Sequence, residues 1–84
     1  MMVDLAEKIL VGRVLIDILD EQTVKLDDPY DDELPLFIHK AMIIRLKMKQ
    51  WHSTHGQPPE MIDQLEQMDK IIKRLMELQN KKCC

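Results

Sequence analysis

The sequence predicts an all-α protein, and three observations carry this prediction. Apolar residues recur at intervals of three and four along three segments, which is the spacing of a helix face. Two glycines in 84 residues are too few for the tight turns of an all-β fold. An acidic segment and a proline-containing segment divide the chain into three parts. We therefore expect a three-helix bundle that forms a single helical domain over residues 1–84.

The first predicted helix covers about residues 3–20. Its apolar residues project in nearly every direction, namely Val3, Leu5, Ile9, Leu10, Val11, Val14, Leu15, Ile16, Ile18 and Leu19. A helix that is apolar all round is a buried helix. A three-helix monomer does not surround any of its helices, whereas an intertwined dimer can. Gly12 costs about 1 kcal/mol in a helix interior and is tolerable if another backbone approaches closely there.

Residues 21–33 are predicted to form an acidic loop. Five acids fall within seven residues of it, namely Asp27, Asp28, Asp31, Asp32 and Glu33. Pro29 ends any helix before it, and acids next to the start of the following helix complement its dipole. Tyr30, Asp31 and Asp32 are the candidates for contact with a partner in this loop, because an exposed tyrosine offers a large contact area.

The second predicted helix, about residues 35–52, has two apolar faces. One face follows a heptad-like spacing through Phe37, Ala41, Ile44, Met48 and Trp51. A second ridge lies on roughly the opposite side and consists of Ile38, Met42, Ile43 and Leu46. A chain of this size has a small core and covers one such face but not both. We therefore expect the second ridge to be an interface with another chain, identical or foreign.

A turn at residues 53–57 precedes the third predicted helix, about residues 58–80, and a frayed tail at 81–84 follows it. Glu60 and Asp63 open this helix and Lys81 closes it, as the helix dipole favours. Its apolar stripe is Met61, Leu65, Met68, Ile72 and Leu75. The short turn predicts that the second and third helices form an antiparallel hairpin. Dimerisation is expected to complete the bundle.

Residues with metal-binding or catalytic chemistry are few and poorly spaced. The candidate zinc ligands are His39, His52, His55, Cys83 and Cys84, but the chain has no Cys-x2-Cys or His-x3-His spacing. The acidic loop lacks the central glycine of an EF-hand. No nucleophile elbow or phosphate-binding glycine loop is present. We therefore expect no enzyme, no metal and no cofactor.

The same features predict a cytoplasmic protein that does not enter a membrane. Adjacent cysteines cannot form a disulfide framework, and the N-terminus has no basic region ahead of its apolar stretch. The apolar stretch at residues 9–19 contains Gly12, Arg13 and Asp17 and is shorter than the roughly 20 residues that cross a bilayer.

The charge distribution leaves two functional hypotheses. Residues 1–35 carry ten acids and three bases, whereas residues 36–84 carry nine bases and five acids. The hypothesis that we favour is a homodimeric, non-catalytic interaction module, an adaptor, inhibitor or chaperone-like regulator, that binds a partner protein through an apolar helical surface. The alternative is a small DNA- or RNA-binding regulator that uses basic strips on the second and third helices. Purely structural self-assembly is a third possibility.

Overall fold

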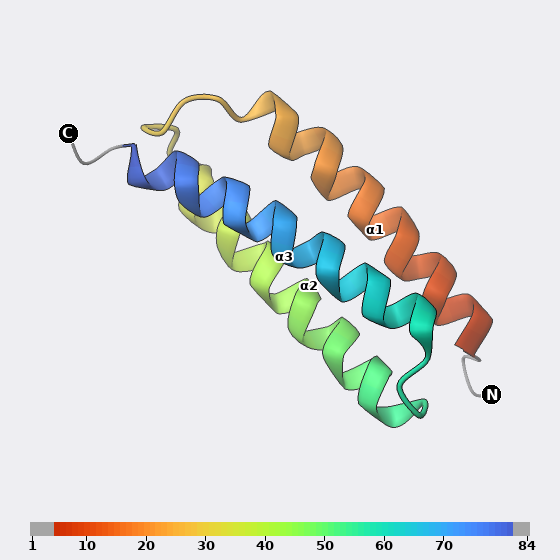
Figure 1. Cartoon of the computed structure of the whole chain (residues 1–84). Coiled ribbons are helices and arrows are strands. Elements are labelled where there is room, and N and C mark those ends of the chain that lie inside the picture. Colours follow the sequence, from red (N-terminus) through yellow and green to blue (C-terminus); the bar gives the residue numbers. More distant parts are fainter. Residues whose placement is uncertain (1–4, 82–84) are drawn as a thin grey trace.

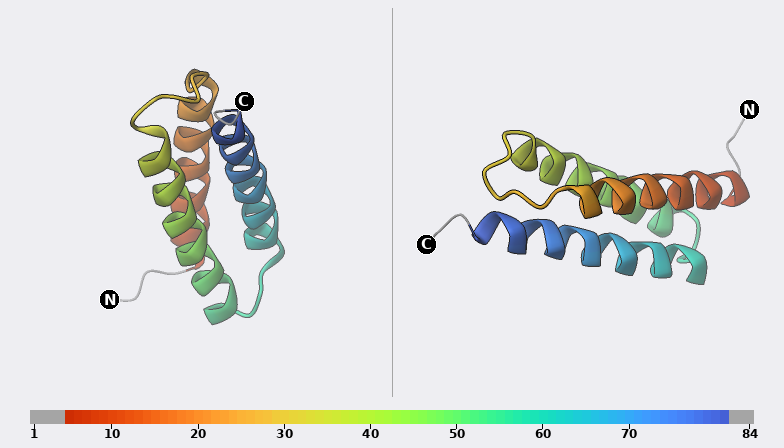
Figure 2. Two further views of the ribbon diagram at one scale, coloured as in Figure 1. Left: turned by 90° about the vertical axis from the view of Figure 1, so that its left-hand side faces the viewer. Right: turned by 90° about the horizontal axis from the view of Figure 1, so that it is seen from above.

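A computed structural model describes residues 5–81 of the chain as three helices (Figure 1). Helix α1 covers Leu5–Lys25, α2 covers Leu34–Thr54 and α3 covers Pro59–Asn80. Helix α2 runs antiparallel to the other two, so that α1 and α3 are parallel (Figures 1 and 2). The predicted all-α bundle and its antiparallel α2–α3 hairpin are confirmed.

Helix α3 holds the bundle together. It packs against both other helices, whereas α1 and α2 contact each other least. Its buried side follows the helical repeat predicted from the sequence and includes Met61, Met68, Ile72 and Leu75. The core therefore lies along α3, and α1 and α2 each pack against one side of this helix.

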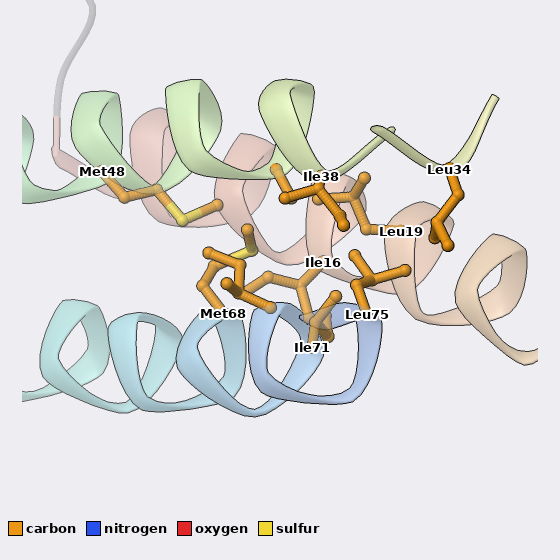
Figure 3. Packing of buried hydrophobic residues seen from close by; sticks show 10 residues of the cluster. Ile16, Leu19, Leu34, Ile38, Met48, Met68, Ile71 and Leu75 are labelled. Atoms are coloured by element: carbon orange, nitrogen blue, oxygen red, sulfur yellow. The ribbon is translucent and has the colours of Figure 1, made fainter. Parts of the chain in front are cut away.

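The core is a continuous apolar cluster to which all three helices contribute (Figure 3). Its buried members are Ile16, Leu19, Leu34, Ile38, Ala41, Met48, Met68, Ile71, Ile72 and Leu75. Truncation of a fully buried aliphatic residue to alanine typically costs about 2–5 kcal/mol, because it leaves a cavity. The described chain thus has a formed core of its own.

Helix α1 continues to Lys25, five residues beyond its predicted end, and the acidic loop is correspondingly shorter. The hydroxyl of Thr23 donates a 2.6 Å hydrogen bond to the Leu19 carbonyl, and Thr23 is buried. Lys25 and Glu21 also lie within 3.9 Å on the last turn. These local contacts and burial extend the helix into a segment that composition alone marks as a loop.

The other predicted bounds differ by one or two residues. Helix α2 begins one residue earlier and ends two residues later than expected, and α3 begins at Pro59. The expected start at Val3 and the tail at 82–84 lie outside the described residues. In the turn between α2 and α3, Gly56 has a φ of 77° and Gln57 a φ of 58°. Left-handed conformations of this kind end a helix, as glycine at such a position predicts.

The α2–α3 turn is tied to α1 at one end of the bundle. Lys8 Nζ lies 2.8 Å from His55 Nε2, and it is 5.9 Å from the centroid of the Trp51 ring. An ammonium group can donate to an unprotonated imidazole nitrogen and also interact with the aromatic face. This contact joins the first turns of α1 to the end of α2 and to the turn that follows it.

Candidate protein-binding surface

The structure separates Ile38 from the other residues of the predicted ridge. Ile38 is only 7 % exposed and belongs to the core. It lies one turn after buried Leu34 and three residues before buried Ala41, so it shares their side of the helix. The core side of α2 is therefore wider than the predicted heptad-like face, and the assignment of Ile38 to a second face was wrong.

Met42, Ile43 and Leu46 remain exposed in the three-helix chain. Ile43 is 54 % exposed and Leu46 is 56 % exposed. Leu36 joins them at 65 % exposure, although the sequence interpretation did not include it. Its spacing of seven residues from Ile43 was the signal that could have identified it. We call these four residues, Leu36, Met42, Ile43 and Leu46, the outer face of α2.

The orientation of this face follows from one ion pair. Arg45 Nε donates a hydrogen bond to Asp69 Oδ1, so Arg45 points toward α3. A residue two positions away on a helix is rotated by about 200°. Ile43 and Lys47 therefore point away from α3, on the opposite side of the bundle.

Lysines border the outer face of α2 on both sides. On one border, Lys40 follows Leu36 by four residues and Lys47 follows Ile43 by four residues. Lys49 follows Leu46 by three residues on the other border. All three lysines are exposed. Because residues 34–54 include no Asp or Glu, the surface is both apolar and positively charged.

Helix α1 also exposes apolar residues in the single chain, as expected of a three-helix monomer, which does not surround any of its helices. Leu10, Val14 and Ile18 recur every four residues, and Val11 lies beside them. We call these four residues the outer stripe of α1. The Asp20 side chain accepts a hydrogen bond from Arg74 of α3. Ile18 lies two positions before Asp20, so it is rotated by about 200° and points away from α3.

The candidate residues of the acidic loop do not join the outer face of α2. Tyr30 and Asp32 are exposed, and the loop lies at the end of the bundle where α2 begins (Figure 1). Leu46 lies twelve residues into α2 from Leu34, which corresponds to about 18 Å along the helix axis. The predicted set therefore divides into a loop and a helix face.

Asp31 has a local structural role in this loop. Its Oδ1 accepts a 2.9 Å hydrogen bond from the Glu33 N–H, and its carbonyl accepts one of 3.1 Å from the Leu34 N–H. The Tyr30 N–H donates similarly to Asp28 Oδ1 at 2.9 Å. These turns lead the chain into α2 at a place where Glu33, the N-cap residue, makes no side-chain cap.

Other kinds of site find little support in the described residues. Within residues 5–81 no three His, Cys, Asp or Glu side chains are grouped so that they could hold a metal ion, and Cys83 and Cys84 lie outside that range. A hollow with a volume of about 420 Å³ lies between α1 and α3. Charged and amide side chains form much of its lining, including Arg13, Asp17, Glu60, Asp63, Gln64 and Gln67. None of the three described helices is long and apolar enough to cross a membrane.

Comparison of the chain with protein-family models, curated proteins and solved structures finds no significant match. The functional interpretation therefore rests on the two exposed apolar surfaces, the outer face of α2 and the outer stripe of α1.

Proposed function

We propose that this chain is a non-catalytic protein-binding module that binds a partner protein through the outer face of α2. The supporting observation is the exposure of Leu36, Met42, Ile43 and Leu46 on a helix whose other side is already buried in the core. These residues contribute nothing to the described core. A group of exposed apolar residues on one side of a helix is typical of a surface that another helix or protein covers.

We further propose that the chain acts as a homodimer, with the outer stripe of α1 as the contact between two copies. Leu10, Val14 and Ile18 lie on successive turns of α1, and a second copy of this stripe would cover them. A helix–helix contact that repeats a four-residue spacing permits close ridge packing. The two surfaces then have separate roles, one in self-association and one in partner binding.

Paired variants test this division of roles. Leu46→Asp places a charge on the outer face of α2 and is expected to abolish capture of the partner in pull-downs from cell extract. Ile62→Asp on α3 is the matched control, because Ile62 is similarly exposed but lies on a different helix. Capture that is unchanged by Leu46→Asp, or lost equally with Ile62→Asp, would contradict the proposal.

Binding of DNA or RNA is the second candidate function, and the lack of acids on α2 favours it. The exposed Lys40, Lys47 and Lys49 could contact phosphates. Such binding would weaken steeply as salt increases, whereas contacts made by Leu36, Ile43 and Leu46 would persist. A duplex-binding titration at two salt concentrations separates the candidates. Tight, salt-sensitive binding that Leu46→Asp leaves intact would favour the nucleic-acid function.

A further inference from the structure

The positive charge around the outer face of α2 indicates what kind of partner fits it. We propose that this face binds an acidic amphipathic helix, that is, a helix whose apolar stripe is bordered on both sides by Asp or Glu. This inference rests on the proposed function and adds the chemistry of the partner to it.

The shape of the face favours a helical partner. Leu36 and Leu46 are ten residues apart on one straight helix, so the face extends for about 15 Å. A second helix can place residues of its own i, i+3, i+4 and i+7 pattern along such a ridge. Helices packed in this way lie about 8–10 Å apart, which brings flanking side chains of both helices into contact.

The charge of the face favours acids on the partner. Lys40 and Lys47 border one side of the apolar ridge and Lys49 borders the other. None of the three takes part in an ion pair within the described residues. The aliphatic stems of lysines can extend the apolar contact while their ammonium groups meet carboxylates at the rim. The lysines would repel a partner with positive charges at this rim, so the face would discriminate against basic partners.

Other occupants fit less well. A nucleic acid would contact the lysines but leave Ile43 and Leu46 uncovered. An anionic membrane that approached this face would repel the acidic loop that precedes α2. Within the described part of α1, a second copy carries Asp17 on one border of its outer stripe and no acid on the other border, so it would match the lysines on one side only.

Three synthetic peptides test the proposal with the full-length protein. Each peptide is about 18 residues long, enough to form a helix, and has the same Leu/Ile stripe. The stripe is bordered on both sides by Glu in the first peptide, by Gln in the second and by Lys in the third. Fluorescence anisotropy at physiological salt measures their affinities. We expect the Glu peptide to bind about tenfold more tightly than the Gln peptide and the Lys peptide to bind weakest.

Variants of the protein locate the binding. Lys47→Glu should weaken binding of the Glu peptide about tenfold and improve binding of the Lys peptide. Lys73→Glu, a change of an exposed lysine on α3, is the matched control and should leave both affinities unchanged. Ile43→Asp should abolish binding of all three peptides. Circular dichroism establishes that each variant keeps its helices.

The outcomes distinguish this inference from the proposed function. If the Glu and Gln peptides bind equally and Ile43→Asp abolishes both, the acidic partner is refuted while an apolar binding face stands. If no peptide binds, or if Ile43→Asp leaves binding intact, both proposals fail. Preferential binding of phosphatidylserine vesicles or duplex DNA through Lys47 would also overturn the acidic helix. Dissociation of the homodimer by Ile43→Asp would also overturn the acidic helix, because it would mean that a second copy occupies the face.

Discussion

Gln64 on α3 lies directly against Gly12 on α1, and its Nε2 donates a 2.8 Å hydrogen bond to the Ile9 carbonyl. The side chain is 5 % exposed, so this amide is one of the few buried polar groups of the bundle. A Cβ atom at position 12 would overlap Gln64 Oε1. Glycine in the middle of α1 thus makes room for a polar side chain that bridges two helices. The sequence interpretation held that a close approach of another backbone would make Gly12 tolerable, and the group that approaches it is a side chain.

Gly12→Ala is expected to destabilise the protein by about 1–2 kcal/mol. Alanine adds about 1 kcal/mol of helix propensity, but it displaces the Gln64 amide, strains the packing and breaks the bond to Ile9. For a domain of this size, such a loss lowers Tm by roughly 4–16 °C. Thermal and urea unfolding at one fixed protein concentration measure the change.

A double variant checks the cause. Gln64→Ala removes the group that the new methyl would meet, so Gly12→Ala should be less harmful, or even favourable, in its presence. Gln67→Ala, an exposed glutamine on the same helix, is the control that should not rescue. An alanine at position 12 that raises Tm in the otherwise native chain would show that the overlap has no energetic consequence.

Ile38 and Ile43 provide a direct comparison of core and surface on α2. Ile38→Ala should cost about 2–4 kcal/mol, because it opens a cavity in the core. Ile43→Ala should change the free energy of unfolding by less than about 0.5 kcal/mol in the monomer. Urea denaturation of both variants at low protein concentration makes the measurement. Similar costs for the two variants would mean that Ile43 is also covered.

The fold was predictable because helical periodicity and chain breaks are local signals. The apolar residues of α3 recur every three or four positions on one side of the helix, and its buried stripe agrees with the predicted one almost throughout. Helix α2 is apolar on most of its circumference, so periodicity alone could not decide whether Ile38 faces the core. Whether Ile38 faces the core depends on which side of α2 packs against α3. The contact between Arg45 and Asp69 identifies that side, and it is known only from the structure. The extension of α1 to Lys25 likewise depends on tertiary burial of Thr23.

Asp31 should matter for stability more than for binding. Asp31→Ala removes the acceptor for the Glu33 N–H and should cost about 0.5–1 kcal/mol. Asp31→Asn keeps a carbonyl oxygen in the same place and should restore most of that stability. Thermal unfolding compares the two variants. A tenfold loss of partner affinity in Asp31→Asn, with stability retained, would instead make the loop a recognition element.

His55 should stabilise one end of the bundle, since it accepts a hydrogen bond from Lys8 and so joins the α2–α3 turn to α1. His55→Ala is expected to lower the free energy of unfolding by about 1 kcal/mol. His39→Ala, a change at an exposed histidine on α2, should have almost no effect. Chemical denaturation of both variants tests the difference. Equal effects of the two substitutions would show that the Lys8 contact contributes no stability.

The most direct test of the two-surface interpretation is the mass of the protein in solution. Light scattering across a dilution series, under reducing conditions, should give twice 10.0 kDa for the native chain. Val14→Asp places a charge in the outer stripe of α1 and should reduce the mass to that of one chain while its circular dichroism stays helical. Leu46→Asp should leave the dimer intact. The assignment of self-association to α1 and partner binding to α2 would be contradicted if the native chain remained a monomer at every concentration. It would also be contradicted if Leu46→Asp dissociated the dimer and Val14→Asp did not.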